Sequence, residues 1–243
     1  TYGDWSSDVC SSDLNIQAIV TQPAPLTATA VPANILCNGL STGSVQVSAS
    51  GGTAPYTGTG TFTGLTAGVY NYTVRDANNC TITLSAEVKQ PPLLVLTGST
   101  VNASCNGGSN GSAVITATGG TPPYAGTGTF SGLGAGSYNY TVTDAKGCSK
   151  TFTANITAPP PITLSEVHTP VTCNGGNNGT ATITAAGGTG PYTGTGLITG
   201  LSAGTHSFTV TDSKGCTASI NVTITQPPPI LVTETHKIGR AHV

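Results

Sequence analysis

Apolar and polar residues alternate along short segments of this chain. In GSAVITAT, residues 111–118, this alternation places Ala113, Ile115 and Ala117 on one face, and SYNYTVTD at 137–144 repeats the pattern. Successive side chains of a strand point to opposite faces, so a period of two predicts strands with one buried face. No segment shows the period of a helix. The pattern predicts an all-β protein.

Turn residues separate these segments at short intervals. DAKG at 144–147 and DSKG at 212–215 are typical of tight turns, because Asp bonds nearby backbone and Gly tolerates positive φ. A segment before each CNG and another at PPYAGTGTF extend the set, and we expect six or seven strands in a β-sandwich. GLTAGVYNYTV around Tyr70 resembles a tyrosine corner, with His206 at the equivalent position of a later copy.

The whole pattern repeats every 68 residues. Proline-rich marks begin at Gln22, Gln90, Ala158 and Gln226, and CNG…GGT-PY aligns without gaps between them. We therefore divide the chain into the end of an earlier copy, three complete repeats and the start of a later copy. These segments are residues 15–26, 27–94 (repeat 1), 95–162 (repeat 2), 163–230 (repeat 3) and 231–236.

The two ends of the chain, residues 1–14 and 237–243, do not fit this period. A DNA sequence that encodes DVCSSDL, residues 8–14, has a reverse complement that encodes the final KIGRAHV. This inverted match, together with the resemblance of GDWSSDVCSSDL to a translated sequencing adapter, indicates that both tails are artefacts. They are left out of the fold prediction, and with them Trp5 and Cys10.

The composition of the chain argues against nucleic acid and anionic lipid as partners of the array. Only 7% of residues are charged and the net charge is −2, which provides no basic surface for nucleic acid or anionic lipid. No apolar run reaches the roughly 18 residues that span a bilayer, so we expect no direct membrane insertion. Cysteines in even number and fixed register indicate an oxidising compartment, and we expect an extracellular, cell-surface location.

The motif CNG…GGT-PY…L-AG-Y-YTVTDA-GC…QPPP resembles the SprB-type repeats of gliding bacterial surface adhesins, over residues 15–236. The resemblance implies tandem Ig-like β-sandwich modules in a long adhesin, exported by a dedicated secretion system and displayed for surface attachment or gliding. One departure is the shortened TGTGTFTGL after Tyr56, where such repeats commonly carry an aromatic-rich stretch.

Six cysteines in register are the candidates for disulfide bonds. Pairing within each repeat requires both cysteines at the same end of the module, and hence four intervening strands rather than five; the shortened loop favours four. Each such bond would contribute roughly 3 to 4 kcal/mol in the chain-entropy model. The alternative pairs neighbouring cysteines across each linker. The residues are Cys37, Cys80, Cys105, Cys148, Cys173 and Cys216.

No cofactor, metal or catalytic site is expected. Zinc lacks ligands, because each repeat has one cysteine pair and His168 and His206 occupy non-equivalent positions. No carboxylate pair or nucleophile–base set recurs, so we expect no enzymatic activity. The acids in register favour turn capping over calcium, which needs several carboxylates. These acids are Asp76, Asp144 and Asp212.

Two functional hypotheses remain open. In the first, the repeats contact only their neighbours and form a semi-rigid stalk with polyproline-like connectors. In the second, each repeat weakly binds glycan or another extracellular surface, and affinity accumulates by multivalency. Candidate contacts for the second are Tyr56, Tyr124 and Tyr192, although a core role is the favoured interpretation of these tyrosines.

Overall fold

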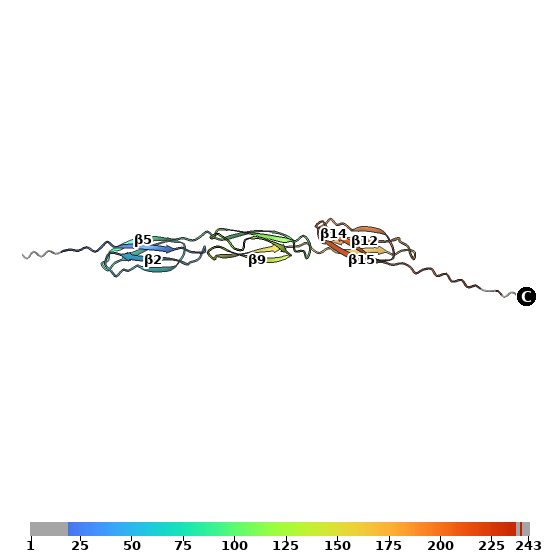
Figure 1. Cartoon of the computed structure of the whole chain (residues 1–243), viewed down its shortest axis with the longest axis horizontal. Coiled ribbons are helices and arrows are strands. Elements are labelled where there is room, and N and C mark those ends of the chain that lie inside the picture. Colours follow the sequence, from blue (N-terminus) through green and yellow to red (C-terminus); the bar gives the residue numbers. More distant parts are fainter. Residues whose placement is uncertain (1–18, 237–238, 240–243) are drawn as a thin grey trace, which may run out of the picture. The chain divides into compact units, whose positions relative to one another are not determined.

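A computed structural model describes residues 19–236 and 239 of the 243-residue chain. All its regular elements are strands, five in each repeat, and the described residues contain no helix (Figure 1). The chain divides into two compact units, Thr1–Pro91 and Pro92–Val243. The strands of repeat 1 belong to the first unit, and those of repeats 2 and 3 to the second. The two tails interpreted as artefacts lie outside the described residues, apart from Gly239.

Repeat 1 shows the plan of the module. A three-stranded antiparallel sheet has the order β1 (Thr27–Ala33), β2 (Gly43–Ser50) and β3 (Gly60–Leu65). A second, two-stranded sheet is the hairpin of β4 (Gly68–Arg75) and β5 (Thr81–Val88). Contacts between the two sheets are most extensive where β5 meets β1. Each module is therefore a small Ig-like β-sandwich.

Repeats 2 and 3 have the same plan, and their strands recur at steps of 68 residues. Repeat 2 consists of β6 (Val95–Val101), β7 (Gly111–Thr118), β8 (Gly128–Leu133), β9 (Gly136–Thr143) and β10 (Ser149–Ile156). Repeat 3 consists of β11 (Thr163–Thr169), β12 (Gly179–Ala186), β13 (Gly196–Leu201), β14 (Gly204–Thr211) and β15 (Thr217–Ile224).

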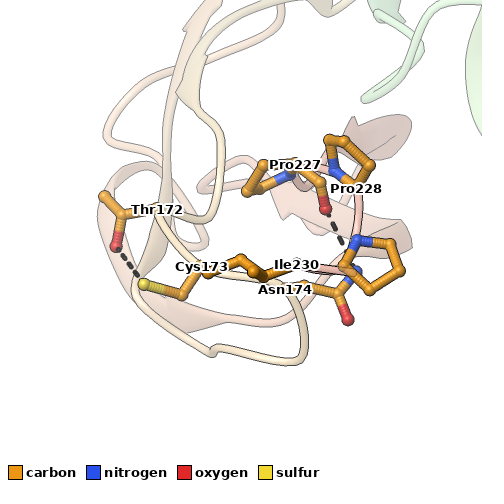
Figure 2. A pocket seen from close by; sticks show the side chains of 7 residues that line it. Thr172, Cys173, Asn174, Pro227, Pro228 and Ile230 are labelled. Carbon is orange, nitrogen blue, oxygen red and sulfur yellow. Dashed lines mark hydrogen bonds between the residues drawn. The ribbon is translucent and has the colours of Figure 1, made fainter. Parts of the chain in front are cut away.

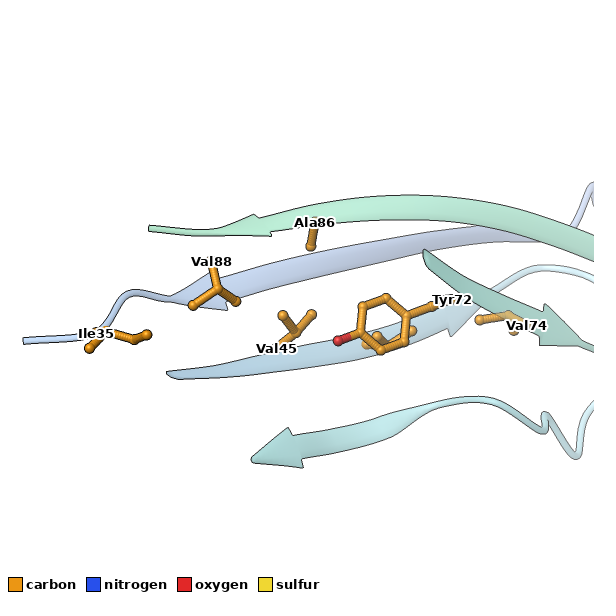
Figure 3. Packing of buried hydrophobic residues seen from close by; sticks show 7 residues of the cluster. Ile35, Val45, Tyr72, Val74, Ala86 and Val88 are labelled. Atoms are coloured by element: carbon orange, nitrogen blue, oxygen red, sulfur yellow. The ribbon is translucent and has the colours of Figure 1, made fainter. Parts of the chain in front are cut away.

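The core of each module is a thin layer of small apolar side chains. Ala113 and Ile115 on β7 are fully buried and Ala117 is half-buried, as the alternation predicts. In repeat 1 aliphatic residues from both sheets surround Tyr72 on β4 (Figure 3). The ring of Tyr72 packs 4.7 Å from that of Phe62 on β3, measured between centroids. Tyr140 and Phe130 form the equivalent pair in repeat 2.

Five strands, rather than the expected six or seven, form each repeat. The segment after Tyr124 contributes only an isolated bridge, Ala125 to Thr143, before β8 begins. Gly126 in this segment has a φ of +89°, a left-handed conformation outside the extended region. The strand count inferred from segment spacing was therefore too high, because this segment is mainly a loop.

The predicted tyrosine corner is confirmed. The Tyr70 hydroxyl donates to the carbonyl of Thr66 at 3.0 Å, and Tyr138 makes the same bond in repeat 2. In repeat 3 the ring nitrogen Nε2 of His206 lies 2.8 Å from the carbonyl oxygen of Ser202. Each side chain anchors the turn that precedes the late strand on which it stands.

Candidate functional site

A disulfide bond joins repeat 2 to repeat 3. Cys105, in the CNG loop after β6, is bonded to Cys216, in the turn before β15, with 5.6 Å between their Cα atoms. Both predicted pairings were wrong for these cysteines, since neither the partner within the repeat nor the nearest cysteine across the linker is used. The bond instead connects residues 111 positions apart.

The strand count explains why the pairing within a repeat fails. Three strands, β7 to β9, separate Cys105 from Cys148 in place of the expected four, and an odd number of strands places the two residues at opposite ends of the module. The neighbour of Cys105, Asn106, bonds the linker that follows repeat 2. Cys148 donates its amide to Asp144, which also binds Thr121 beside the linker that precedes the repeat.

The linker between repeats 2 and 3 is held from both sides. From repeat 2, Nδ2 of Asn106 donates to the carbonyl of Pro159 at 3.3 Å. From repeat 3, the amide of Gly188 donates to the carbonyl of Pro160 at 2.9 Å. The disulfide adds a covalent connection beside these two bonds. The repeats are therefore joined by backbone, hydrogen bonds and sulfur at one junction.

A capped turn positions Cys216. The buried carboxylate of Asp212 accepts hydrogen bonds from the amides of Lys214 and Cys216 through Oδ1, and from that of Thr189 through Oδ2, at 2.8 to 2.9 Å. Burial raises the pKa of Asp212, but bonds from Cys216, Thr189 and other amides outweigh it and lower the pKa below its ordinary value. The turn-capping interpretation is confirmed.

The same cap recurs in the other repeats. Asp144 has a lowered pKa because backbone amides, Thr121 first among them, outweigh the opposing effect of its burial. For Asp76 the bond from the amide of Thr53 is the largest cause of the lowered pKa. The oxygens of each carboxylate therefore accept hydrogen bonds from backbone amides in and beside the turn.

The loop of Cys105 is equally well fixed. The carbonyl of Cys105 accepts from the amide of Gly108 at 3.0 Å, which closes the CNGG turn. The side chain of Asn110 accepts from the amide of Ser104 at 2.9 Å and donates back to its hydroxyl. The carbonyl oxygen of Ser104 in turn lies 3.3 Å from Sγ of Cys216. The loop therefore presents Cys105 in one orientation.

The remaining cysteines in the described residues fall into two classes. Cys80 and Cys173 are free thiols and are exposed. Cys37 and Cys148 are in the disulfide form. The expectation of disulfide bonding in every copy is therefore not met at Cys80 or at Cys173.

The three tyrosines proposed as surface contacts are half-buried and pack against the cores. The Tyr56 hydroxyl donates to the carbonyl of Gly51 at 2.6 Å, and that of Tyr124 to Gly119 at 2.5 Å. Tyr192 donates in the same way to Gly187. Each ring thus fastens the loop that carries the GG pair to the sandwich, which leaves little of it for an external ligand.

Sequence reasoning missed the residues that bind the linker. Asn106 and Gly188 belong to the CNG and GGT motifs, which recur in all three repeats and were recognised only as signatures. Their recurrence in every repeat, at a fixed distance from each proline run, was the signal that could have revealed this role.

The described residues contain no cluster of three or more His, Cys, Asp or Glu side chains that could hold a metal ion. His168 lies on the surface of β11, where Nδ1 is 2.9 Å from a carboxylate oxygen of Glu166. Residues 19–236 and 239 contain no helix of the length and apolarity that a membrane span requires.

Comparison with known proteins identifies the repeats. No curated protein matches the chain. A solved structure, the N-terminal eight Ig domains of Down Syndrome Cell Adhesion Molecule (DSCAM) isoform 1.30.30, aligns with 84% of this chain at 9% identity and a TM-score of 0.28. The chain spans 48% of the length of that structure, and a likeness this low carries no argument.

The SprB repeat family matches residues 29–57, 97–125 and 165–193. Each match begins in the first strand of a module and ends in the loop after the GGT motif. SprB repeats indicate a cell-surface, adhesin-like repeat protein, which is a structural and adhesive rather than an enzymatic type. The chain is an array of three SprB-type, Ig-like repeats.

Proposed function

We propose that the array is a semi-rigid spacer, which holds an adhesive part of a secreted surface protein away from the cell for attachment or gliding. The observation that supports it is the Cys105–Cys216 bond between consecutive repeats. A proline-rich linker alone restricts the chain but leaves neighbouring modules free to pivot. A second, covalent connection beside the linker removes much of that freedom.

The same bond protects the array against unfolding. Closing a loop of 111 residues removes about 5 kcal/mol of conformational freedom from the unfolded chain in the chain-entropy model. Modules of this size have small cores and commonly need such support. A bond that spans two modules also couples their stabilities. If one module unfolds, the bond still holds its cysteine against the other module and limits the conformations that it can adopt.

The structure gives less support to a multivalent glycan-binding array. Such sites usually present aromatic faces, whereas Tyr56, Tyr124 and Tyr192 use their hydroxyls internally and pack on the core. Retention of the three-repeat chain by one class of immobilised glycan would favour the binding array over the spacer.

Single-molecule fluorescence between repeats 2 and 3 tests the spacer function. Dyes attached through unnatural amino acids at the exposed positions Thr129 and Leu197 report the distance between equivalent sites of the two modules. We expect a narrow distance distribution in the oxidised chain, and a broad one in the Cys105→Ser/Cys216→Ser variant, where only the linker and its hydrogen bonds remain.

A matched control uses the two cysteines that are free. Cys80→Ser/Cys173→Ser changes the same number of sulfur atoms without removing a bond, and should leave the distribution narrow. A distribution in the oxidised parent chain as broad as that of the Cys105→Ser/Cys216→Ser variant would contradict a spacer function.

A further inference from the structure

The two free thiols stand at positions equivalent to the two cysteines of the bonded pair. Cys173 is the repeat 3 equivalent of Cys105, and Cys80 is the repeat 1 equivalent of Cys216. The bonded pair lies 111 positions apart, with the loop cysteine in one repeat and the turn cysteine in the next. A partner at this spacing after Cys173 or before Cys80 falls outside the 243 residues.

Half of a junction is already built around Cys173. A cleft of about 480 Å³ is lined by Cys173, Asn174 and the proline run 227–229 (Figure 2). Nδ2 of Asn174 donates to the carbonyl of Pro227 at 3.0 Å, as Asn106 does to Pro159 in the closed junction. The loop and linker therefore have the conformation that accepts a turn cysteine, with the thiol exposed.

The complementary half is built around Cys80. A cleft beside this thiol is lined by Asp76, Asn78 and residues 22–26. Oδ1 of Asp76 accepts from the amide of Cys80 at 2.9 Å, and the amide of Gly52 donates to the carbonyl of Ala24. The capped turn and its linker contact thus match those of repeat 3 at the closed junction.

Exposed apolar residues before the first strand of repeat 1 and after the last strand of repeat 3 also fit a further module at each end. Ile230 and Val232 are 93% and 86% exposed, whereas the residues 68 positions earlier, Ile162 and Leu164, are half-buried against repeat 3. The apolar side chains in this segment occupy positions that a folded repeat covers. A further module of the same type would therefore cover these side chains.

The opposite end shows the same pattern. Val20 is 92% exposed, although its equivalents in repeats 1 to 3 are at most 3% exposed. These equivalents are Val88, Ile156 and Ile224.

We propose that each end of this array accepts a further SprB-type repeat through an inter-repeat disulfide. Cys173 bonds the turn cysteine of the repeat that follows, and Cys80 bonds the loop cysteine of the repeat that precedes. The partner is thus a neighbouring module of the same kind, and the bond has the register of Cys105–Cys216. The inference goes beyond the spacer function, because a glycan-binding array would have the same connections.

Formation of each bond needs an oxidant of the disulfide class. Glutathione disulfide supplies it: one protein thiolate displaces a glutathione thiolate to form a mixed disulfide, and the second protein thiolate then displaces the other. One S–S bond forms in the protein as one breaks in glutathione. The two electrons lost by the protein sulfurs reduce glutathione disulfide to two thiols, which also take up the two protons.

The test extends the chain by one repeat. A copy of residues 163–230 is inserted after Ile230, in a Cys10→Ser background, which places the turn cysteine of the copy 111 positions after Cys173. After refolding with reduced and oxidised glutathione, free thiols are alkylated and mapped. We expect alkylation of Cys173 to fall about tenfold or more compared with the parent chain, since a tethered partner has an effective concentration in the millimolar range or above.

Two controls separate pairing from misfolding. In an extended chain whose added copy carries serine at its turn cysteine, Cys173 should become reactive again. Hydrogen exchange in that same variant tests the fold of the added copy without sulfur chemistry, and the amides in its first strand, the copy of residues 163–169, should be protected. Continued alkylation of Cys173 in the extended chain, a bond between the two cysteines of the added copy, or unprotected amides in the first strand of that copy would each overturn the proposal.

Discussion

Tyr70 and Tyr72 stand two positions apart on β4 and have different roles. The hydroxyl of Tyr70 anchors the preceding turn through the carbonyl of Thr66. The hydroxyl of Tyr72 is buried and has no hydrogen-bond partner in the part of the chain that the structure describes. Burial is the main cause of the raised pKa of Tyr72, and the neighbouring Tyr70 adds to it. Phe208 occupies the equivalent position in repeat 3.

We predict opposite effects of removing these two hydroxyls. Tyr70→Phe should lower the free energy of unfolding by about 1 kcal/mol, because it removes the bond to the carbonyl of Thr66 and the 3.1 Å bond between the hydroxyls of Tyr70 and Thr66. Tyr72→Phe should be neutral or slightly stabilising, because it removes a buried polar atom that has no partner. Denaturant unfolding of both variants checks this, and a larger loss for Tyr72→Phe than for Tyr70→Phe would contradict the assignment.

The linker and the GG loop depend on close backbone contact. Gly187 has a φ of +78°, and a Cβ placed there would lie 2.0 Å from the carbonyl oxygen of Pro161. Gly200 on β13 has nearly the same φ, +77°, with nothing within 4 Å of its Cβ position. The two glycines therefore share a backbone conformation and differ in whether the linker lies against them.

Alanine substitution at Gly187 and Gly200 distinguishes the cost of the positive φ from the cost of displacing the linker. Gly200→Ala should cost about 1 kcal/mol, the usual penalty of a left-handed conformation for a residue with a Cβ. Gly187→Ala should cost at least about 2 kcal/mol, because the new methyl group must also displace the linker. Unfolding of the oxidised chain measures both values. Equal losses would show that the contact with Pro161 contributes nothing to stability.

The elements themselves could be predicted well from sequence. Alternation placed Ala113 and Ile115 in the core, and the Asp and Gly of residues 144–147 identified the hairpin turn. The extra strands were a misinterpretation, because the turn chemistry around Gly126 makes that segment a loop. Strand spacing alone does not reveal which segments have partners.

The disulfide register could not be obtained in the same way. An even number of intervening strands does place two cysteines at the same end of a module. The prediction, however, counted four strands between the cysteines of one repeat, and the structure has three. The repeats also carry cysteines in identical local sequences, so the sequence does not show which copy bonds which. That choice depends on how the end of one module meets the start of the next, at contacts such as Asn106 with Pro159.

The properties of repeats 2 and 3 as a pair follow from their junction. Each module alone has a thin core, mostly of Val, Ile and Ala, and such small modules gain stability from neighbours and crosslinks. The Cys105–Cys216 bond makes two consecutive modules one covalent unit in addition to the backbone. The central claim is therefore that sulfur connects successive repeats, whereas the interior of a single repeat is held by packing and turns.

Peptide mapping under non-reducing conditions tests this claim most directly. Trypsin separates the two cysteines, because Cys105 lies in the fragment 90–146 and Cys216 in 215–237, while Cys148 lies in the short fragment 147–150. We predict that 90–146 is linked to 215–237 and separates from it on reduction. A link between 90–146 and 147–150, the bond within one repeat, would contradict the account.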